Sequence, residues 1–128
     1  MSLLPHVQRS LAAVALVTLT AGAVAAGPLP KKIGQCTETT VKSVEYRLEG
    51  APDSGSAISY ANGGYQVSYE AVPAIKRSRR GDKIRLCLIE LPIDCPPGDE
   101  RGKIYRATNL RTGESWELPD SEHGCGGA

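Results

Sequence analysis

The chain contains no phenylalanine, one tryptophan and five tyrosines, and its histidines are limited to His6 and His123. The G-x-S-x-G, G-x-x-x-x-G-K-[ST], H-E-x-x-H and G-x-G-x-x-G sequences are also missing. These motifs build the common nucleophilic, phosphate-binding, zinc-dependent and dinucleotide-binding sites. Their absence argues against those enzyme classes, and we expect no cofactor and no metal. Hydrolysis by paired carboxylates stays open, because aspartate and glutamate are plentiful and their separation in space is not readable from a sequence.

The chain also lacks an excess of either charge. It has 15 basic and 14 acidic residues, and removal of the first 26 residues, which include Arg9, leaves a formal charge of zero. A neutral domain is not expected to bind nucleic acid or anionic membranes in general, because those affinities rest on a basic excess. Most basic residues lie in residues 27–85 and most acidic ones in residues 86–128. We expect these two parts to lie beside each other in one fold and to neutralise each other.

There is a single long apolar run, residues 11–26, which follows a short polar lead with His6 and Arg9. A basic lead, a short apolar stretch and a small-residue end are the parts of a secretory signal peptide. We therefore predict a signal peptide over residues 1–26, with cleavage after Ala25 or Ala26, and a secreted or periplasmic protein. The alternative is an uncleaved membrane anchor, but the run is shorter than the roughly 20 residues that span a bilayer.

The four cysteines all follow the predicted signal peptide. An even number of cysteines in a small exported chain indicates two disulfides, for which three pairings are possible. We predict Cys87–Cys95, which closes a short loop, and Cys36–Cys125, which joins the chain ends. A zinc site is disfavoured, because no C-x-x-C pair is present and His123 is the single histidine after residue 26.

Residues 27–35 are predicted to be a flexible lead and residues 36–128 a single small β domain. Alternating or β-branched segments predict strands over residues 36–48, 57–61, 65–70, 83–91, 103–108 and 114–118. Residues 50–56, rich in glycine, proline and serine, are predicted to be a loop. No convincing amphipathic helix is present. We therefore expect an all-β fold, a small antiparallel β-barrel or sandwich of five or six short strands, of the oligonucleotide/oligosaccharide-binding (OB) or SH3-like type.

In two segments, the sequence predicts which side chains share one face of a strand. Asn62, Gly63 and Gly64 suit a tight hairpin turn, because asparagine and glycine accept positive φ angles. On the strands around this turn, we expect Tyr65, Val67 and Tyr69 to share a face with Ile58 and Tyr60. In residues 83–91, one face is formed by Ile84, Leu86 and Leu88.

A basic run is the first candidate binding feature. It could hold a phosphate, a sulfated sugar or an acidic protein surface, and its members are Lys76, Arg77, Arg79, Arg80, Lys83 and Arg85. The alternative is a solvated loop beside the acidic part of the same fold. Arg80-Gly81-Asp82 also spells a cell-adhesion tripeptide, but a turn before a strand explains these three residues without any partner.

A set of aromatic residues is the second candidate. A stacking platform for sugar rings or a partner peptide could include Tyr60, Tyr65, Tyr69 and Trp116. The alternative is core packing, since a chain without phenylalanine must fill its core with other large side chains.

Together these features predict an exported, disulfide-stabilised binding module of the cell envelope or extracellular space. Its partner would be a protein or a glycan, not nucleic acid, and an inhibitor-like role would suit its size. Two alternatives remain: a small secreted hydrolase that uses paired carboxylates, and a structural envelope protein without a discrete ligand.

Overall fold

The computed structural model describes residues 2–19 and 26–127. Residues 2–19 contain no helix or strand, and the first predicted cleavage site, after Ala25, lies outside the described residues. Within the described ranges, no helix is long and apolar enough to cross a membrane. The elements are β1 (Cys36–Leu48), β2 (Ala51–Tyr60), β3 (Tyr65–Ser68), α1 (Pro73–Lys76), β4 (Lys83–Glu90), β5 (Ile104–Asn109) and β6 (Ser115–Pro119).

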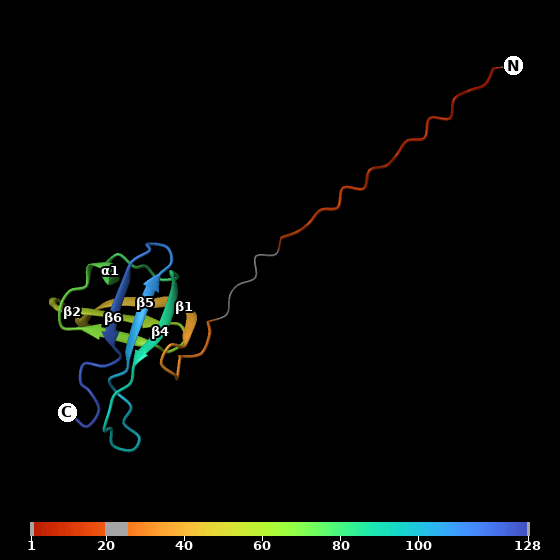
Figure 1. Cartoon of the computed structure of the whole chain (residues 1–128). Helices are drawn as coiled ribbons and strands as arrows, with labels where there is room; N and C mark the ends of the chain where they lie inside the picture. The colour runs from red at the N-terminus through yellow and green to blue at the C-terminus, as the bar shows by residue number, and fades with distance from the viewer. Residues whose placement is uncertain (1, 20–25, 128) are drawn as a thin grey trace.

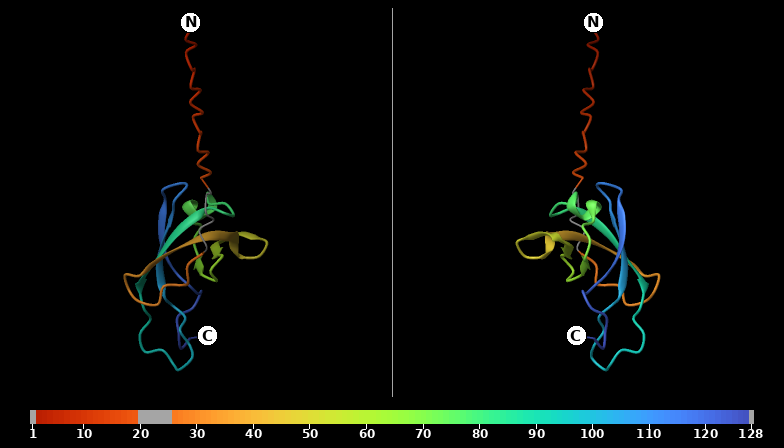
Figure 2. Two further views of the ribbon diagram at one scale, coloured as in Figure 1. Left: turned by 90° about the vertical axis from the view of Figure 1, so that its right-hand side faces the viewer. Right: turned by 90° about the vertical axis from the view of Figure 1, so that its left-hand side faces the viewer.

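The six strands form one antiparallel sheet in the order β3-β2-β1-β4-β5-β6. The long strand β1 belongs to both halves of this sheet: its first part, up to Thr40, pairs with β4, and its later part, from Val41, pairs with β2. The two halves run across each other around the core (Figures 1 and 2). The predicted all-β class is confirmed, and α1 is a single turn of helix.

The alternation in residues 83–91 correctly predicts the inner face of β4, where Ile84, Leu86 and Leu88 are at most 1% exposed. The remaining large core residues come from both halves of the sheet and from α1; they are Val41, Ile58, Tyr60, Ile75, Tyr105 and Trp116. β4, β5 and β6 bury alternate residues, as expected for antiparallel strands around one core, whereas Gly55–Ile58 of β2 and Gln66–Val67 of β3 are buried consecutively.

The predicted loop at residues 50–56 is wrong, because most of this segment belongs to β2. Tyr46 pairs with Ser56, whereas Leu48 pairs with Ala51, so four residues of β2 bulge opposite one residue of β1. The Ser54 hydroxyl accepts a hydrogen bond from the backbone N–H of Leu48 and donates one to the carbonyl of Ala51. The proline, serine and glycine of this segment therefore form a bulge inside a strand rather than a free loop.

The β2–β3 hairpin turns at the predicted Asn62–Gly64 segment, with Gly63 at φ 86°. The predicted faces are wrong, however, because Gln66, and not Tyr65 or Val67, pairs with Ile58 and is buried with it. The Tyr60 hydroxyl and the Trp116 indole N–H both donate to the Gln66 Oε1, at 2.6 and 2.9 Å. A buried amide satisfied by hydrogen bonds takes the place that alternation alone would assign to an apolar residue.

Gln66 also joins the two ends of the sheet. Its Nε2 donates to the carbonyls of Tyr105 on β5 and Leu118 on β6, at 2.8 and 3.1 Å. The strands β3 and β6 are not paired through their backbones in the sheet order. The sheet is therefore not closed, so the expected barrel is not shown, but a side chain bridges the opening.

Both predicted disulfide pairings are wrong. The structure contains Cys36–Cys87 and Cys95–Cys125 instead. Cys36 and Cys87 are directly opposite on β1 and β4, with their Cα atoms 4.0 Å apart. The second bond ties the loop after β4 to the tail after β6, which project together from one end of the sheet (Figure 1). Strand neighbours decide this pairing, and they are invisible in the spacing of cysteines along the chain.

Residues 27–35, predicted to be a flexible lead, lie against the sheet. The backbone N–H of Gly27 donates to the carbonyl of Glu38, and that of Gly34 donates to the carbonyl of Leu88. Pro30 is buried and Leu29 packs against the core. This segment therefore contributes contacts to the domain.

Candidate functional site

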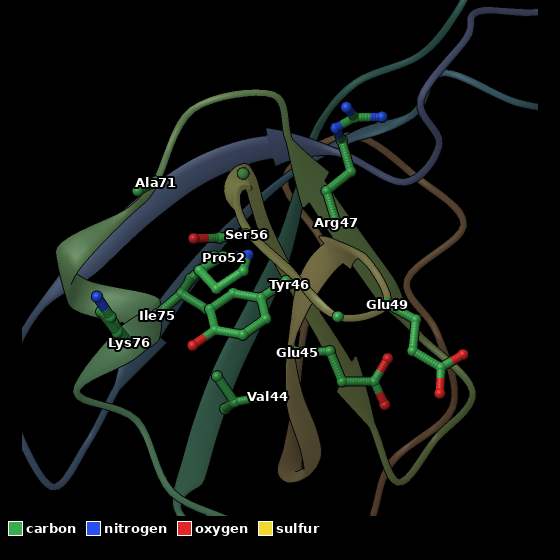
Figure 3. Close-up of a pocket in the computed structure, with 12 residues that line it drawn as sticks. Val44, Glu45, Tyr46, Arg47, Glu49, Pro52, Ser56, Ala71, Ile75 and Lys76 are labelled. Atoms are coloured by element: carbon green, nitrogen blue, oxygen red, sulfur yellow. The ribbon is translucent and has the colours of Figure 1, made fainter.

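An open groove with a volume of about 730 Å³ is present among the described residues. It is bordered by the end of the β1–β2 hairpin, which projects in Figure 2, and by the segment that carries α1 (Figure 3). The hairpin extends past the strands of the other half of the sheet, so its concave face is not fully covered. Such a volume falls within the range of about 300–1,000 Å³ that is typical of ligand pockets.

The centre of the groove is apolar. The ring of Tyr46 lies there beside Val44, Pro52 and Ile75 (Figure 3). Tyr46 points to the same side of β1 as Val44, but it lies beyond the closed part of the core and is 42% exposed. A half-exposed aromatic ring above a buried isoleucine is a surface on which a partner side chain or a sugar ring can pack.

The two ends of the groove carry opposite charges. Lys76, the last residue of α1, lies at one end, and Glu49 of the hairpin lies at the other, whereas the Glu45 side chain extends to the side of β1 opposite the Tyr46 ring (Figure 3). None of the six ion pairs between described residues includes any of these three side chains. The charges of Lys76 and Glu49 are therefore free to pair with a ligand, and they give the groove a direction.

Six of the 14 carboxylates form ion pairs within the protein. Asp99, Glu114 and Glu117 form ion pairs with Arg101, Arg77 and Arg106, respectively. The neighbouring arginines lower the pKa of Asp99 and of Glu114, whereas a general acid needs a raised pKa. Within the described ranges, no cluster of three or more histidine, cysteine, aspartate or glutamate residues could hold a metal ion.

The predicted basic run is divided by the fold. Lys76 lines the groove, and the Arg77 guanidinium makes a two-pronged contact with Glu114. Arg79, Arg80 and Lys83 are exposed around the turn before β4. Arg85 lies further along the outer face of β4, opposite Glu38 of β1. The basic run therefore does not form one continuous surface, although Arg79, Arg80 and Lys83 remain close together around the turn.

Asp82 of the Arg80-Gly81-Asp82 sequence is only 8% exposed. Its carboxylate accepts hydrogen bonds from the Arg111 guanidinium at 2.7 and 2.9 Å, from Asn109 Nδ2 at 2.9 Å and from the backbone N–H of Arg79 at 2.8 Å. A partner therefore has no access to this carboxylate as an adhesion ligand. Asp82 instead fastens the turn to β5 and to the loop that follows it.

Replacing Asp82 with asparagine is expected to lower the free energy of unfolding by roughly 2 kcal/mol at pH 7, because charge-assisted hydrogen bonds are lost. The Arg111 guanidinium, helped by Asn109, lowers the pKa of Asp82 despite its burial. The unfolded chain thus binds the proton more readily, and this stabilisation disappears as the pH falls below about 4. Urea unfolding from pH 7 to pH 3 should show the two proteins converging in acid. The exposed Asp53→Asn variant is the control, and an unchanged difference at pH 3 would contradict this account.

The aromatic residues of the predicted stacking platform also do not form one surface. Tyr60 and Trp116 are core residues, at 1% and 6% exposure, and are hydrogen-bonded to Gln66, so they form no part of an exposed platform. Burial raises the pKa of the Tyr60 hydroxyl. Tyr69 is 55% exposed, but the Arg47 guanidinium lies 4.3 Å from its ring centre. One face of that ring is therefore covered within the protein.

Sequence reasoning missed the residues that shape the groove, namely Tyr46, Glu45 and Glu49. The alternation in residues 36–48 places Tyr46 on the apolar face of a strand, which by itself indicates burial. The sequence did contain one indication of the groove, the Gly50–Ser56 segment. Its residues have small side chains, so they cover the neighbouring Tyr46 only in part. Comparisons of the chain with protein-family models, with curated proteins and with solved structures find no match.

Proposed function

We propose that the protein is an exported, non-catalytic binding module that recognises an extended segment of a partner protein in the Tyr46 groove. The observation that carries the proposal is the half-exposed Tyr46 ring at the centre of a groove whose ends bear unpaired charges of opposite sign. A peptide supplies an apolar side chain and both charge signs within a few residues, whereas a neutral sugar supplies no charge. Aromatic residues in partly enclosed pockets supply much of the binding energy at protein interfaces.

Two disulfides indicate a non-reducing environment, either extracellular or periplasmic. This agrees with the predicted signal peptide and with a partner outside the cytoplasm. The ion pairs that engage Asp99, Glu114 and Glu117 support a binding role over hydrolysis. We expect a basic side chain of the bound segment to face Glu49 and an acidic one to face Lys76.

A random dodecapeptide library selected against residues 27–128 should enrich peptides with an apolar residue between a basic and an acidic one. Tyr46→Ala should weaken their binding at least tenfold, as expected for a loss of about 1.4 kcal/mol or more. Because Tyr46 is half exposed, this variant should keep its thermal midpoint. Arg106→Ala, on the outer face of β5, is the control and should bind the peptides normally.

A charge exchange provides the sharper test. The Glu49→Lys, Lys76→Glu variant should select peptides with the reverse order of charges. Equal peptide binding by the wild type and Tyr46→Ala would overturn the proposal. Enrichment on a glycan array, lost in Tyr46→Ala, would change the partner class from protein to glycan. A carboxylate whose replacement by alanine abolishes hydrolysis of an envelope polymer would favour the hydrolase.

A further inference from the structure

A cluster of unpaired basic side chains lies at the end of the domain where β4 begins. We call it the basic turn, and it comprises Lys42, Arg79, Arg80 and Lys83. The backbone N–H of Gly81 donates to the carbonyl of Val41, the N–H of Val41 donates to the carbonyl of Asp82, and Thr40 pairs with Lys83 in the sheet. Lys42, which is distant in sequence from the others, is thereby brought next to the turn. All four side chains are exposed.

Among the carboxylates near the basic turn, Glu38 is in no ion pair between described residues; it lies opposite Arg85 in the sheet and lines a small hollow with Lys83. Asp82 and Glu114 are engaged elsewhere. Asp82 lies within the turn, but its carboxylate is buried and bound to Arg111. Glu114 is paired with Arg77. None of the ion pairs between described residues includes a member of the basic turn. In a domain with no net charge, the four cations of the basic turn therefore outnumber Glu38, the unpaired carboxylate beside them, which also faces Arg85.

The basic turn is also held in place. Gly81 adopts φ 89°, the N–H of Asp82 donates to the carbonyl of Arg79, and the N–H of Arg79 donates to the Asp82 carboxylate. These reciprocal bonds fix the backbone that carries Arg79 and Arg80. Guanidinium groups on a fixed backbone lose less freedom on binding than groups on a mobile loop, and their planar donors suit sulfate and phosphate oxygens.

We propose that the basic turn binds a soluble polyanion, a polymer that carries sulfate or phosphate groups along its length. The site is independent of the Tyr46 groove and can bind its ligand whether or not the groove is occupied. A soluble polymer is favoured over a membrane surface, because so few basic residues give only marginal, reversible attachment to anionic lipids without a second anchor.

The test uses residues 27–128 and immobilised heparin, a soluble sulfated polysaccharide. The wild-type domain should be retained at physiological ionic strength, about 0.15 M, although its net charge is near zero. The Lys42→Ala, Lys83→Ala variant should elute in that buffer and bind at least tenfold more weakly. The negative slope of log affinity against log salt concentration should become smaller in magnitude by roughly 1.5, because two contacts are lost.

Lys31→Ala, Lys32→Ala is the matched control. It removes the same two charges from exposed lysines near Gly34, which bonds to Leu88 at the opposite end of β4. Retention of this variant like the wild type would show that position matters and not net charge. Tyr46→Ala should also be retained, which separates this site from the proposed groove function.

Two results would overturn the proposal. The first is equal elution of the two double-lysine variants, since the basic turn would then have no special role. The second is binding to vesicles of phosphatidylcholine with one-fifth phosphatidylglycerol, lost in Lys42→Ala, Lys83→Ala, without binding to heparin. That outcome would assign the basic turn to a membrane surface.

Discussion

Replacing Gln66 with methionine is expected to lower the free energy of unfolding by about 4 kcal/mol. The substitution keeps the size of the side chain, so little cavity forms, but it removes every hydrogen bond of a fully buried amide. Four groups lose a partner: the Tyr60 hydroxyl, the Trp116 indole and the carbonyls of Tyr105 and Leu118. A buried polar group left unpaired costs about 1–3 kcal/mol, so the estimate takes the low end for each.

Urea unfolding followed by far-UV circular dichroism measures this effect through the midpoint and the slope. Gln35→Met is the matched control, because Gln35 is exposed and bonds only the N–H of Lys31 through its side chain. It should change stability by less than about 0.5 kcal/mol. A Gln66→Met protein as stable as this control would show that the amide does not hold β3 against β5 and β6.

Removing the Cys36–Cys87 disulfide as a pair of alanines is expected to cost about 4 kcal/mol in the chain-entropy treatment. This bond joins residues 51 apart in the sequence and links β1 to β4, at the junction of the two halves of the sheet. The effect should appear in the global unfolding transition, measured by urea titration without reductant. A peptide map that showed Cys87 joined to Cys95 would contradict this assignment.

The Cys95–Cys125 bond offers the contrasting case. It joins residues 30 apart and ties together two segments that lie outside the strands. The alanine pair at these positions should speed hydrogen exchange in residues 91–102 and 119–127, while the strands keep most of their protection. Equal loss of protection throughout the domain would show that this lobe is part of the main folding unit.

The strands were predicted best where one face is buried and the other is solvated. Along β4, buried side chains alternate with exposed or half-buried ones, because Ile84, Leu86 and Leu88 all point to one core from one face of the pleat. Residues 51–56 do not alternate, because four of them bulge out of register opposite one residue of β1. A bulge breaks the period of two that strand prediction relies on, so composition alone indicated a loop.

The candidate binding surfaces likewise combine local properties, which the sequence indicates, with properties that only the tertiary structure decides. Exposure of the basic residues is a local property, and the sequence indicated it for Arg79, Arg80 and Lys83. Which cations keep free charges is a tertiary property, because Arg77 is neutralised by Glu114 and Lys42 joins the cluster only through the pairing of Val41 with Gly81. For the groove at Tyr46, the turn residues of Gly50–Ser56 were a local signal, but which strands leave the hairpin uncovered is decided by the tertiary structure.

The sequence by itself determined the all-β class and most strand positions, because alternation and turn residues act between near neighbours in the chain. It also determined that the four cysteines would form two disulfides, although the signal peptide remains a prediction. The tertiary structure decided which cysteines are joined, that Gln66 is a core residue, and which charges remain unpaired. These features depend on contacts between residues that are far apart in the chain. The register between strands sets those contacts, and no local sequence pattern records that register.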